Sequence, residues 1–376
     1  MFYSDWHGCM DGLMKRAIIL LVVGATVSPA IFGAYSAKNV KKKTRTGAPV
    51  RRKHAVKSRL PVVDPTAGDN VDGDDLEVRR AAVDALGPYD GTVVVVDPTS
   101  GRVLTIVNQK TAFDSGFTPC STIKLVTALA ALNEGLVDRD TQVHLTRRYS
   151  MDLSEALAHS NNPYFRILGD RLGFERVSHY ARLFGLGEKA GWDIAGERPG
   201  LVPEAPPEYG GVGLLTSFGE GFKVTPLELA ALVSAIANGG TLYHLQYPRS
   251  QEEIDHFEPR VKRQLAIARW IGDVKPGMRG AVDFGTARRA NYDPTEPILG
   301  KTGTCTDFRA FVHLGWFGSF NDVERHKLVV VVMLKGGHYV NGPVAAGVAG
   351  TIYKQLSQQR FFANAPLFST QSCCGR

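Results

Sequence analysis

Residues 298–333 read ILGKTGTCTDFRAFVHLGWFGSFNDVERHKLVVVVM, and this stretch decides the fold class. Segments rich in β-branched and aromatic residues are separated in it by polar and charged residues, a pattern typical of consecutive strands. The expected strands are Ile298–Cys305, Ala310–Phe317 and Lys327–Met333. Apolar residues at helical spacing follow over about Ala345–Leu356, so we expect a last helix to complete the fold.

Two more strands are expected well upstream, at Thr92–Val96 and Val103–Val107. The residues between them, Asp97-Pro-Thr-Ser-Gly101, form a turn signal, which indicates a β-hairpin. Helical patterns dominate from there to about residue 290, among them Thr122–Glu134 and a helix that starts at the capping box Thr225-Pro-Leu-Glu228. The sequence therefore predicts an α+β fold: an antiparallel five-stranded sheet flanked by helices, with an inserted, mainly helical subdomain.

The segments outside this fold differ from it in composition. We expect a short N-terminal segment at 1–16, a transmembrane anchor or signal peptide at 17–37, a basic flexible tether at 38–73, a folded domain at 74–362 and a disordered tail at 363–376. The run 17–37 carries no charge and is long enough to cross a bilayer. A cleavable signal peptide is the alternative, because the run contains Gly24, Pro29 and Gly33.

The formal charge of +7 has a local origin. The tether holds ten Lys and Arg residues between Lys38 and Arg59 with no Asp or Glu, so the rest of the chain carries about −3. A nucleic-acid partner is therefore not expected. The five cysteines have no zinc-ligand spacing, and there is no glycine-rich phosphate loop, so we expect no metal and no cofactor.

The first candidate motif is Ser121-Thr-Ile-Lys124, at the start of an expected helix. The three-residue offset places both side chains on one helix face. A lysine amine kept neutral by burial can take the serine proton, and the N–H groups at a helix start suit a developing oxyanion. The motif alone has a simpler explanation, a surface lysine beside an N-cap serine.

The second candidate motif is Ser160-Asn-Asn162, between the helical segment Met151–His159 and a segment that begins at Pro163. A second hydroxyl can relay a proton to a leaving group, and an amide can hold a substrate carbonyl. An ordinary loop with an N-cap would look the same.

The third candidate motif is Lys301-Thr-Gly-Thr304, on the first of the three final strands. Lys301 is expected on one face of the sheet, and Gly303 would let a substrate backbone approach. Thr302 and Thr304 offer hydroxyls to a carboxylate. All three motifs in this order make coincidence improbable.

The three motifs resemble the signature motifs of the penicillin-binding protein and serine β-lactamase superfamily, over roughly residues 75–360. Two further stretches are similar to the transpeptidase domains of penicillin-binding proteins. They are Ser217-Phe-Gly-Glu-Gly-Phe-Lys-Val-Thr-Pro-Leu-Glu-Leu-Ala230 with Ala237-Asn-Gly-Gly240, and Gly285-Thr-Ala287. The resemblance implies a peptidoglycan D,D-transpeptidase that binds penicillin.

The resemblance also implies roles for the site residues. Ser121 would be acylated by a peptide ending in D-Ala-D-Ala, with Lys124 as base, Ser160 as proton relay and Asn162 in contact with the acyl chain. Lys301, Thr302 and Thr304 would bind the terminal carboxylate, with Gly303 between them. Backbone N–H groups of Ser121 and Thr304 would form the oxyanion hole. The implied partners are peptidoglycan stem peptides, β-lactams as inhibitors and other proteins of cell-wall synthesis.

Two cysteines flank these motifs: Cys120 precedes Ser121, and Cys305 follows Thr304. If the motifs meet in one cleft, the two cysteines lie within bridging range, and we predict a disulfide between them. Such a bridge fits an oxidising compartment. It also resembles a disulfide of carbapenem-hydrolysing class A β-lactamases.

Two other activities stay open at this point, a serine β-lactamase and a D,D-carboxypeptidase, and a non-catalytic penicillin sensor is a third, weaker alternative. A β-lactamase needs a carboxylate that activates the deacylating water, and Glu197 is the best-placed candidate. The ten positive charges after the apolar run would place the domain in the cytoplasm by the positive-inside rule. The implied chemistry overrides this, so we expect the inner membrane, with the catalytic domain on the periplasmic side.

Overall fold

The computed structural model describes residues 64–307, 311–323 and 326–363, which belong to the compact unit Arg59–Arg376. The predicted segments at 1–16 and 17–37 lie outside the described residues, as do most of the tether and the tail. In the part of the chain that is described, no helix combines the length and the apolar character that a membrane span needs.

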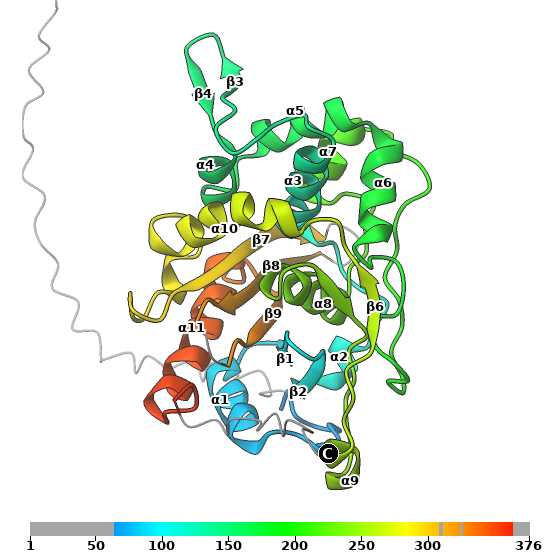
Figure 1. The fold of residues 1–376 in the computed structure, drawn as a ribbon, viewed down its shortest axis with the longest axis vertical. Coiled ribbons are helices and arrows are strands. Elements are labelled where there is room, and N and C mark those ends of the chain that lie inside the picture. The colour runs from blue at the N-terminus through cyan, green and yellow to red at the C-terminus, as the bar shows by residue number, and fades with distance from the viewer. Residues whose placement is uncertain (1–63, 308–310, 324–325, 364–376) are drawn as a thin grey trace, which may run out of the picture. The chain divides into compact units, whose positions relative to one another are not determined.

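A five-stranded sheet forms the centre of the unit, with the strand order β2-β1-β9-β8-β7 (Figure 1). All four neighbouring pairs are antiparallel. The strands are β1 (Gly91–Asp97), β2 (Arg102–Val107), β7 (Ile298–Asp307), β8 (Val312–Asn321) and β9 (Val329–Gly336). The predicted fold class, including the five strands in two separate groups, is confirmed.

The alternation of side chains along the strands builds one hydrophobic core on each face of the sheet. In β1, Val94 and Val96 join the core beneath α8 (Pro226–Ala237), whereas Val93 and Val95 join the core on the opposite face. Helices α1 (Leu76–Leu86) and α11 (Gly342–Gln358) pack on that second face (Figure 1). All residues of α8 are buried, and the predicted capping box at Thr225 and Glu228 fixes where this helix begins.

The predicted helical insertion lies between β2 and β7. Its helices of six or more residues are α3 (Lys124–Asn133), α4 (Leu153–Ala158), α5 (Asn162–Leu172), α6 (Phe174–Leu183), α7 (Gly211–Phe218), α8 and α10 (Ala268–Asp283). Two small antiparallel sheets in this region were not predicted. They pair β3 (Val143–Thr146) with β4 (Tyr149–Met151), and β5 (Thr241–Tyr243) with β6 (Val261–Gln264).

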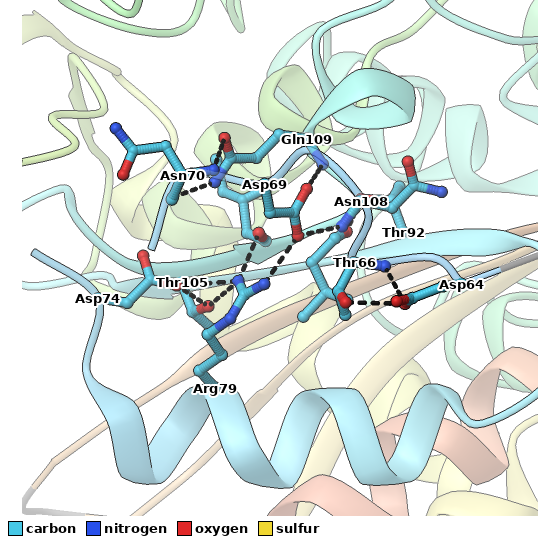
Figure 2. A network of polar contacts seen from close by, with 12 residues as sticks. Asp64, Thr66, Asp69, Asn70, Asp74, Arg79, Thr92, Thr105, Asn108 and Gln109 are labelled. Carbon is cyan, nitrogen blue, oxygen red and sulfur yellow. Dashed lines mark hydrogen bonds and ion pairs between the residues drawn. The ribbon is translucent and has the colours of Figure 1, made fainter. Parts of the chain in front are cut away.

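The chain is already bonded to the domain at Asp69, upstream of residue 74, where we predict that the folded domain begins. The Asp69 carboxylate pairs with Arg79 of α1 at 2.9 Å and accepts backbone N–H groups of Asn108 and Gln109 (Figure 2). Asp74 pairs with the same guanidinium at 3.0 Å. Both carboxylates are almost fully buried. A buried arginine needs carboxylate partners. One of them, Asp69, belongs to the segment 38–73, which its composition predicts to be flexible.

Candidate active site

Ser121, which we expect at the start of an α-helix, lies in a 3-10 turn that precedes the helix. The turn η1 spans Cys120–Ile123, and α3 begins at Lys124. The turn still brings the two side chains together, with Lys124 Nζ 3.0 Å from Ser121 Oγ. Cys120 has a positive φ of 52°, a strained conformation for a residue with a side chain. The strain lies directly before the candidate nucleophile.

The amine of Lys124 is fully buried and is surrounded by oxygen atoms of the second motif. Its Nζ donates to the Ser160 backbone oxygen at 2.7 Å, to Ser160 Oγ at 3.1 Å and to Asn162 Oδ1 at 2.5 Å. Asn162 is the first residue of α5, and Ser160 has a φ of 54° in the link from α4. None of these contacts is a carboxylate, so no negative charge compensates the amine directly.

Lys301, the second fully buried lysine, approaches the same hydroxyl from β7. Its Nζ donates to Ser160 Oγ at 2.8 Å and to the Thr302 backbone oxygen at 2.9 Å. The Ser160 hydroxyl therefore lies between the amine of Lys124, which precedes it in the sequence, and the amine of Lys301, which follows it. All three predicted motifs meet at this point.

The burial of both amines changes their protonation. Burial, together with the charge of Lys301, lowers the pKa of Lys124 to about 6. Burial alone lowers the pKa of Lys301 to about 7. Two amines that share a hydroxyl titrate as a pair, and Lys124 is the one that loses its proton first. A neutral amine beside Ser121 is what a general base requires.

A cavity of about 280 Å³ opens over these groups. The predicted residues Ser121, Ser160, Asn162, Thr302 and Thr304 line it, together with Phe218, Thr286 and Pro343. The last three were not predicted as site residues, although Phe218 and Thr286 belong to the stretches that carried the resemblance.

The hydroxyls of the third motif are held in place from two sides. Thr286 Oγ1 lies 2.6 Å from Thr302 Oγ1, and the Gly342 N–H donates to Thr304 Oγ1 at 2.8 Å. The structure gives a packing reason for glycine at position 303. A Cβ there would lie 2.8 Å from the Pro119 backbone oxygen, so its small size lets β7 pack against the turn that carries Ser121.

The predicted disulfide between Cys120 and Cys305 is present, with 5.5 Å between the Cα atoms. It joins η1 to β7 across 185 residues of sequence. Ser121 and Thr304, whose backbone N–H groups were expected to form the oxyanion hole, are the immediate neighbours of the two cysteines. The bridge therefore fixes the positions of these two backbone N–H groups relative to each other.

Glu197, the alternative water-activating base, does not line the cavity. Its carboxylate accepts the backbone N–H groups of Ala190 at 2.8 Å and Gly191 at 3.1 Å, and the side chain is buried. Burial raises the pKa of this carboxyl, although the two hydrogen bonds oppose the shift. Glu197 therefore holds residues 190 and 191 against its own turn, and the structure gives no support to its role in deacylation.

Comparisons with known proteins agree with this geometry. The family described as Penicillin binding protein transpeptidase domain matches residues 91–354. Stage V sporulation protein D of Bacillus subtilis is 30% identical over 72% of this chain and 48% of its own length. Peptidoglycan D,D-transpeptidase MrdA of Haemophilus influenzae is 24% identical over 78% of this chain and 57% of its own length. The chain thus spans about half the length of these curated relatives.

Solved structures show the same fold. The transpeptidase domain of Burkholderia pseudomallei penicillin-binding protein 3 has a TM-score of 0.66 at 20% identity, covering 78% of this chain and 98% of that domain. Penicillin-binding protein 2 of Pseudomonas aeruginosa has a TM-score of 0.63 at 24% identity, covering 77% of each chain. At these identities the similarity concerns the fold.

Proposed function

Because the chain belongs to the family of penicillin binding protein transpeptidase domains, we propose that it is a peptidoglycan D,D-transpeptidase with Ser121 as nucleophile. The observation that carries the proposal is the 3.0 Å contact between Ser121 Oγ and Lys124 Nζ, in a site that favours the neutral amine. A serine hydroxyl becomes a nucleophile only when a base takes its proton.

In the acylation step, Ser121 Oγ attacks the carbonyl carbon of the penultimate D-alanine, and its proton passes to Lys124 Nζ. The carbonyl oxygen becomes an oxyanion that accepts the N–H groups of Ser121 and Thr304. The C–N bond then breaks, and the amine of the terminal D-alanine receives a proton through the Ser160 hydroxyl, which is replaced from Lys124. D-alanine leaves, and an ester on Ser121 remains.

The terminal carboxylate of the donor peptide selects the substrate. We assign its recognition to the Thr302 and Thr304 hydroxyls and to the charge of protonated Lys301, which Ser160 Oγ and the Thr302 carbonyl hold in place. In the second step the amine of a neighbouring stem peptide attacks the ester carbonyl carbon and its proton goes to Lys124. The bond between that carbon and Ser121 Oγ breaks, and Lys124 returns a proton to Ser121 Oγ, which restores the hydroxyl. A D,D-carboxypeptidase would use water in place of this amine.

The proposed substrate lies outside the cytoplasm. We therefore propose that the domain works on the extracytoplasmic side of the inner membrane, attached through residues 17–37, and that β-lactams inhibit it by acylating Ser121.

Labelling with a fluorescent penicillin tests the proposal. A stable adduct that is absent from the Ser121→Ala variant is expected, whereas rapid turnover of the penicillin would indicate a β-lactamase. Lack of any adduct with the wild-type domain would refute the proposal. Incubation with a stem pentapeptide and an amine acceptor then separates transfer from hydrolysis: cross-linked product is expected, and D-alanine release without it would indicate a carboxypeptidase.

A further inference from the structure

A cavity of about 440 Å³ lies between α6 and β6, and it shares none of its lining residues with the active-site cavity. We call it the α6 pocket. Its lining residues are Glu175, Ser178, His179, Arg182 and Leu183 of α6 and Arg263 of β6. The residues of α6 recur at intervals of three and four, so they share one face of the helix. A volume of this size can hold a small organic ligand.

One buried hydroxyl of the α6 pocket lacks a partner. Only 3% of Ser178 is exposed, and its Oγ makes no hydrogen bond within the part of the chain that the structure describes. A serine inside a helix commonly donates to a carbonyl oxygen four residues earlier, as Ser217 does to Gly213 at 2.6 Å. A buried polar group without a partner costs free energy, so Ser178 at a cavity wall requires an explanation. A ligand atom that accepts its proton provides one.

Most of the other polar groups in the α6 pocket are hydrogen-bond donors. Arg182 is exposed and makes no hydrogen bond or ion pair with another described residue. The His179 ring contacts Tyr180 edge-on and makes no hydrogen bond to any residue in the described ranges. Arg263 donates from Nη1 and Nη2 to Glu188, at 2.5 and 2.8 Å, and its other N–H groups are available to a ligand.

Carboxylates near the α6 pocket do not cancel its positive charge. Glu188 is shared by Arg263 and by Lys262, whose Nζ lies 3.0 Å away, so one carboxylate faces two cations. Glu175 precedes Arg182 by seven residues, which is about 10 Å along the helix axis. Donors from four side chains in one cavity suit a phosphate group, whose oxygen atoms accept hydrogen bonds from several directions. Arginine binds phosphate with two parallel hydrogen bonds.

We propose that the α6 pocket binds a phosphate group. Arg182 and Arg263 would supply the positive charge. His179 would donate from a ring nitrogen, and Ser178 would donate from its hydroxyl. A soluble phosphate ester and the headgroup of a phospholipid both present this group, and binding measurements separate the two sources. The inference does not depend on the proposed function, because the pocket and the active site share no lining residue.

Equilibrium dialysis of the detergent-solubilised full chain with radiolabelled glycerol 3-phosphate tests the proposal, with lactate at equal ionic strength as a carboxylate probe. We expect the phosphate ester to bind about tenfold more tightly than lactate, and Arg182→Gln to weaken its binding by about tenfold. Ser178→Ala should weaken it by about threefold without lowering the thermal midpoint, because the lost hydroxyl has no partner in the protein. Glu175→Gln should strengthen binding, since it removes a negative charge from the pocket.

Arg171→Gln is the matched control, because it removes another exposed arginine, on α5 and outside the pocket, and should leave binding unchanged. Vesicles that contain phosphatidylglycerol test the lipid source. If Arg182→Gln weakens vesicle binding more than the control does, and glycerol 3-phosphate does not bind, the ligand is a lipid headgroup. Equal binding of lactate, equal effects of the two arginine variants on both phosphate probes, or unchanged binding in Ser178→Ala would overturn the proposal. Penicillin labelling of Ser121 should match the wild type in every variant.

Discussion

The domain buries cations in two places, and their surroundings are opposite. Arg79 is enclosed by the carboxylates of Asp69 and Asp74, whereas Lys124 and Lys301 donate their hydrogen bonds to hydroxyl, amide and carbonyl oxygens. Burial alone would lower the pKa of Arg79, but its bonds to Asp69 and the charges of Asp74 and Asp69 raise it. For the two lysines the pKa is lowered.

The difference separates a structural charge from a reactive one. A buried cation with full compensation stays protonated and holds segments together. A buried amine without a carboxylate partner has a lowered pKa and loses its proton easily. Its burial lowers the stability of the fold, and its neutral form can act as a base. Removing each cation should therefore have opposite consequences.

The largest effect is expected for Lys124→Met. Without the base, acylation of Ser121 by penicillin should slow by about 10⁴-fold, since loss of one member of a nucleophile–base pair removes most of the catalysis. The thermal midpoint should stay the same or rise, because a buried charge has been replaced by an apolar side chain of similar length. Stopped-flow acylation and thermal unfolding measure the two outcomes. A marked loss of stability would contradict the comparison.

Arg79→Met is the reciprocal change. It leaves Asp69 and Asp74 buried without their cation, and the free energy of unfolding should fall by about 3–5 kcal/mol. The acylation rate at a temperature where the variant is folded should equal that of the wild type, because Arg79 touches no residue of the cavity. Chemical denaturation measures the first quantity. A loss below 1 kcal/mol would mean that the carboxylates are solvated or protonated instead.

The two clusters also differ in how far they were predictable. The residues that accept hydrogen bonds from the two buried lysines all belong to motifs that are visible in the sequence. They are Ser121, Ser160, Asn162 and Thr302. The residues around Arg79 match no motif. They are common polar types, and they come into contact only when α1 packs against β2. Strands and helices with long apolar patterns were predicted with small errors at their ends.

Other features depended on contacts between distant segments. Thr286 meets Thr302 through the packing of the segment after α10 on β7, and Phe218 reaches the cavity from the end of α7. The 3-10 turn at Ser121 packs against β7, where the disulfide joins the two segments and Gly303 allows their close approach. The hairpin β3–β4 has short strands in a polar sequence, so its periodicity is too weak to identify.

The disulfide gives a third, smaller effect. The site that carries the uncompensated lysines is closed by a covalent bond, and the Arg79 cluster is not. In Cys120→Ala/Cys305→Ala the free energy of unfolding should fall by about 2–4 kcal/mol. Acylation should slow by about tenfold, because the N–H groups of Ser121 and Thr304 lose their fixed separation. Unchanged acylation in the folded double variant would show that packing at Gly303 suffices.

The pH dependence should give the smallest effect and the sharpest test of the lysine pair. The acylation rate should rise with pH through about 6 as Lys124 becomes neutral, and fall above about 7 as Lys301 loses the charge that attracts the substrate carboxylate. In Lys301→Met the like charge is gone, so the pKa of Lys124 should increase and the rising limb should move to higher pH. A limb that stays in place would show that the amines do not interact.

The fastening of Asp69 also has a mechanical consequence. Any tension on the chain upstream of residue 64 enters the domain at Asp69 and is divided at once between Arg79 of α1 and the start of α2 (Gln109–Ala112), through the Asn108 and Gln109 N–H groups. A pull on the chain is therefore shared by several polar bonds of Asp69, which lies upstream of α1. We therefore expect the bonds of Asp69 to bear a pull on the upstream chain before α1 does.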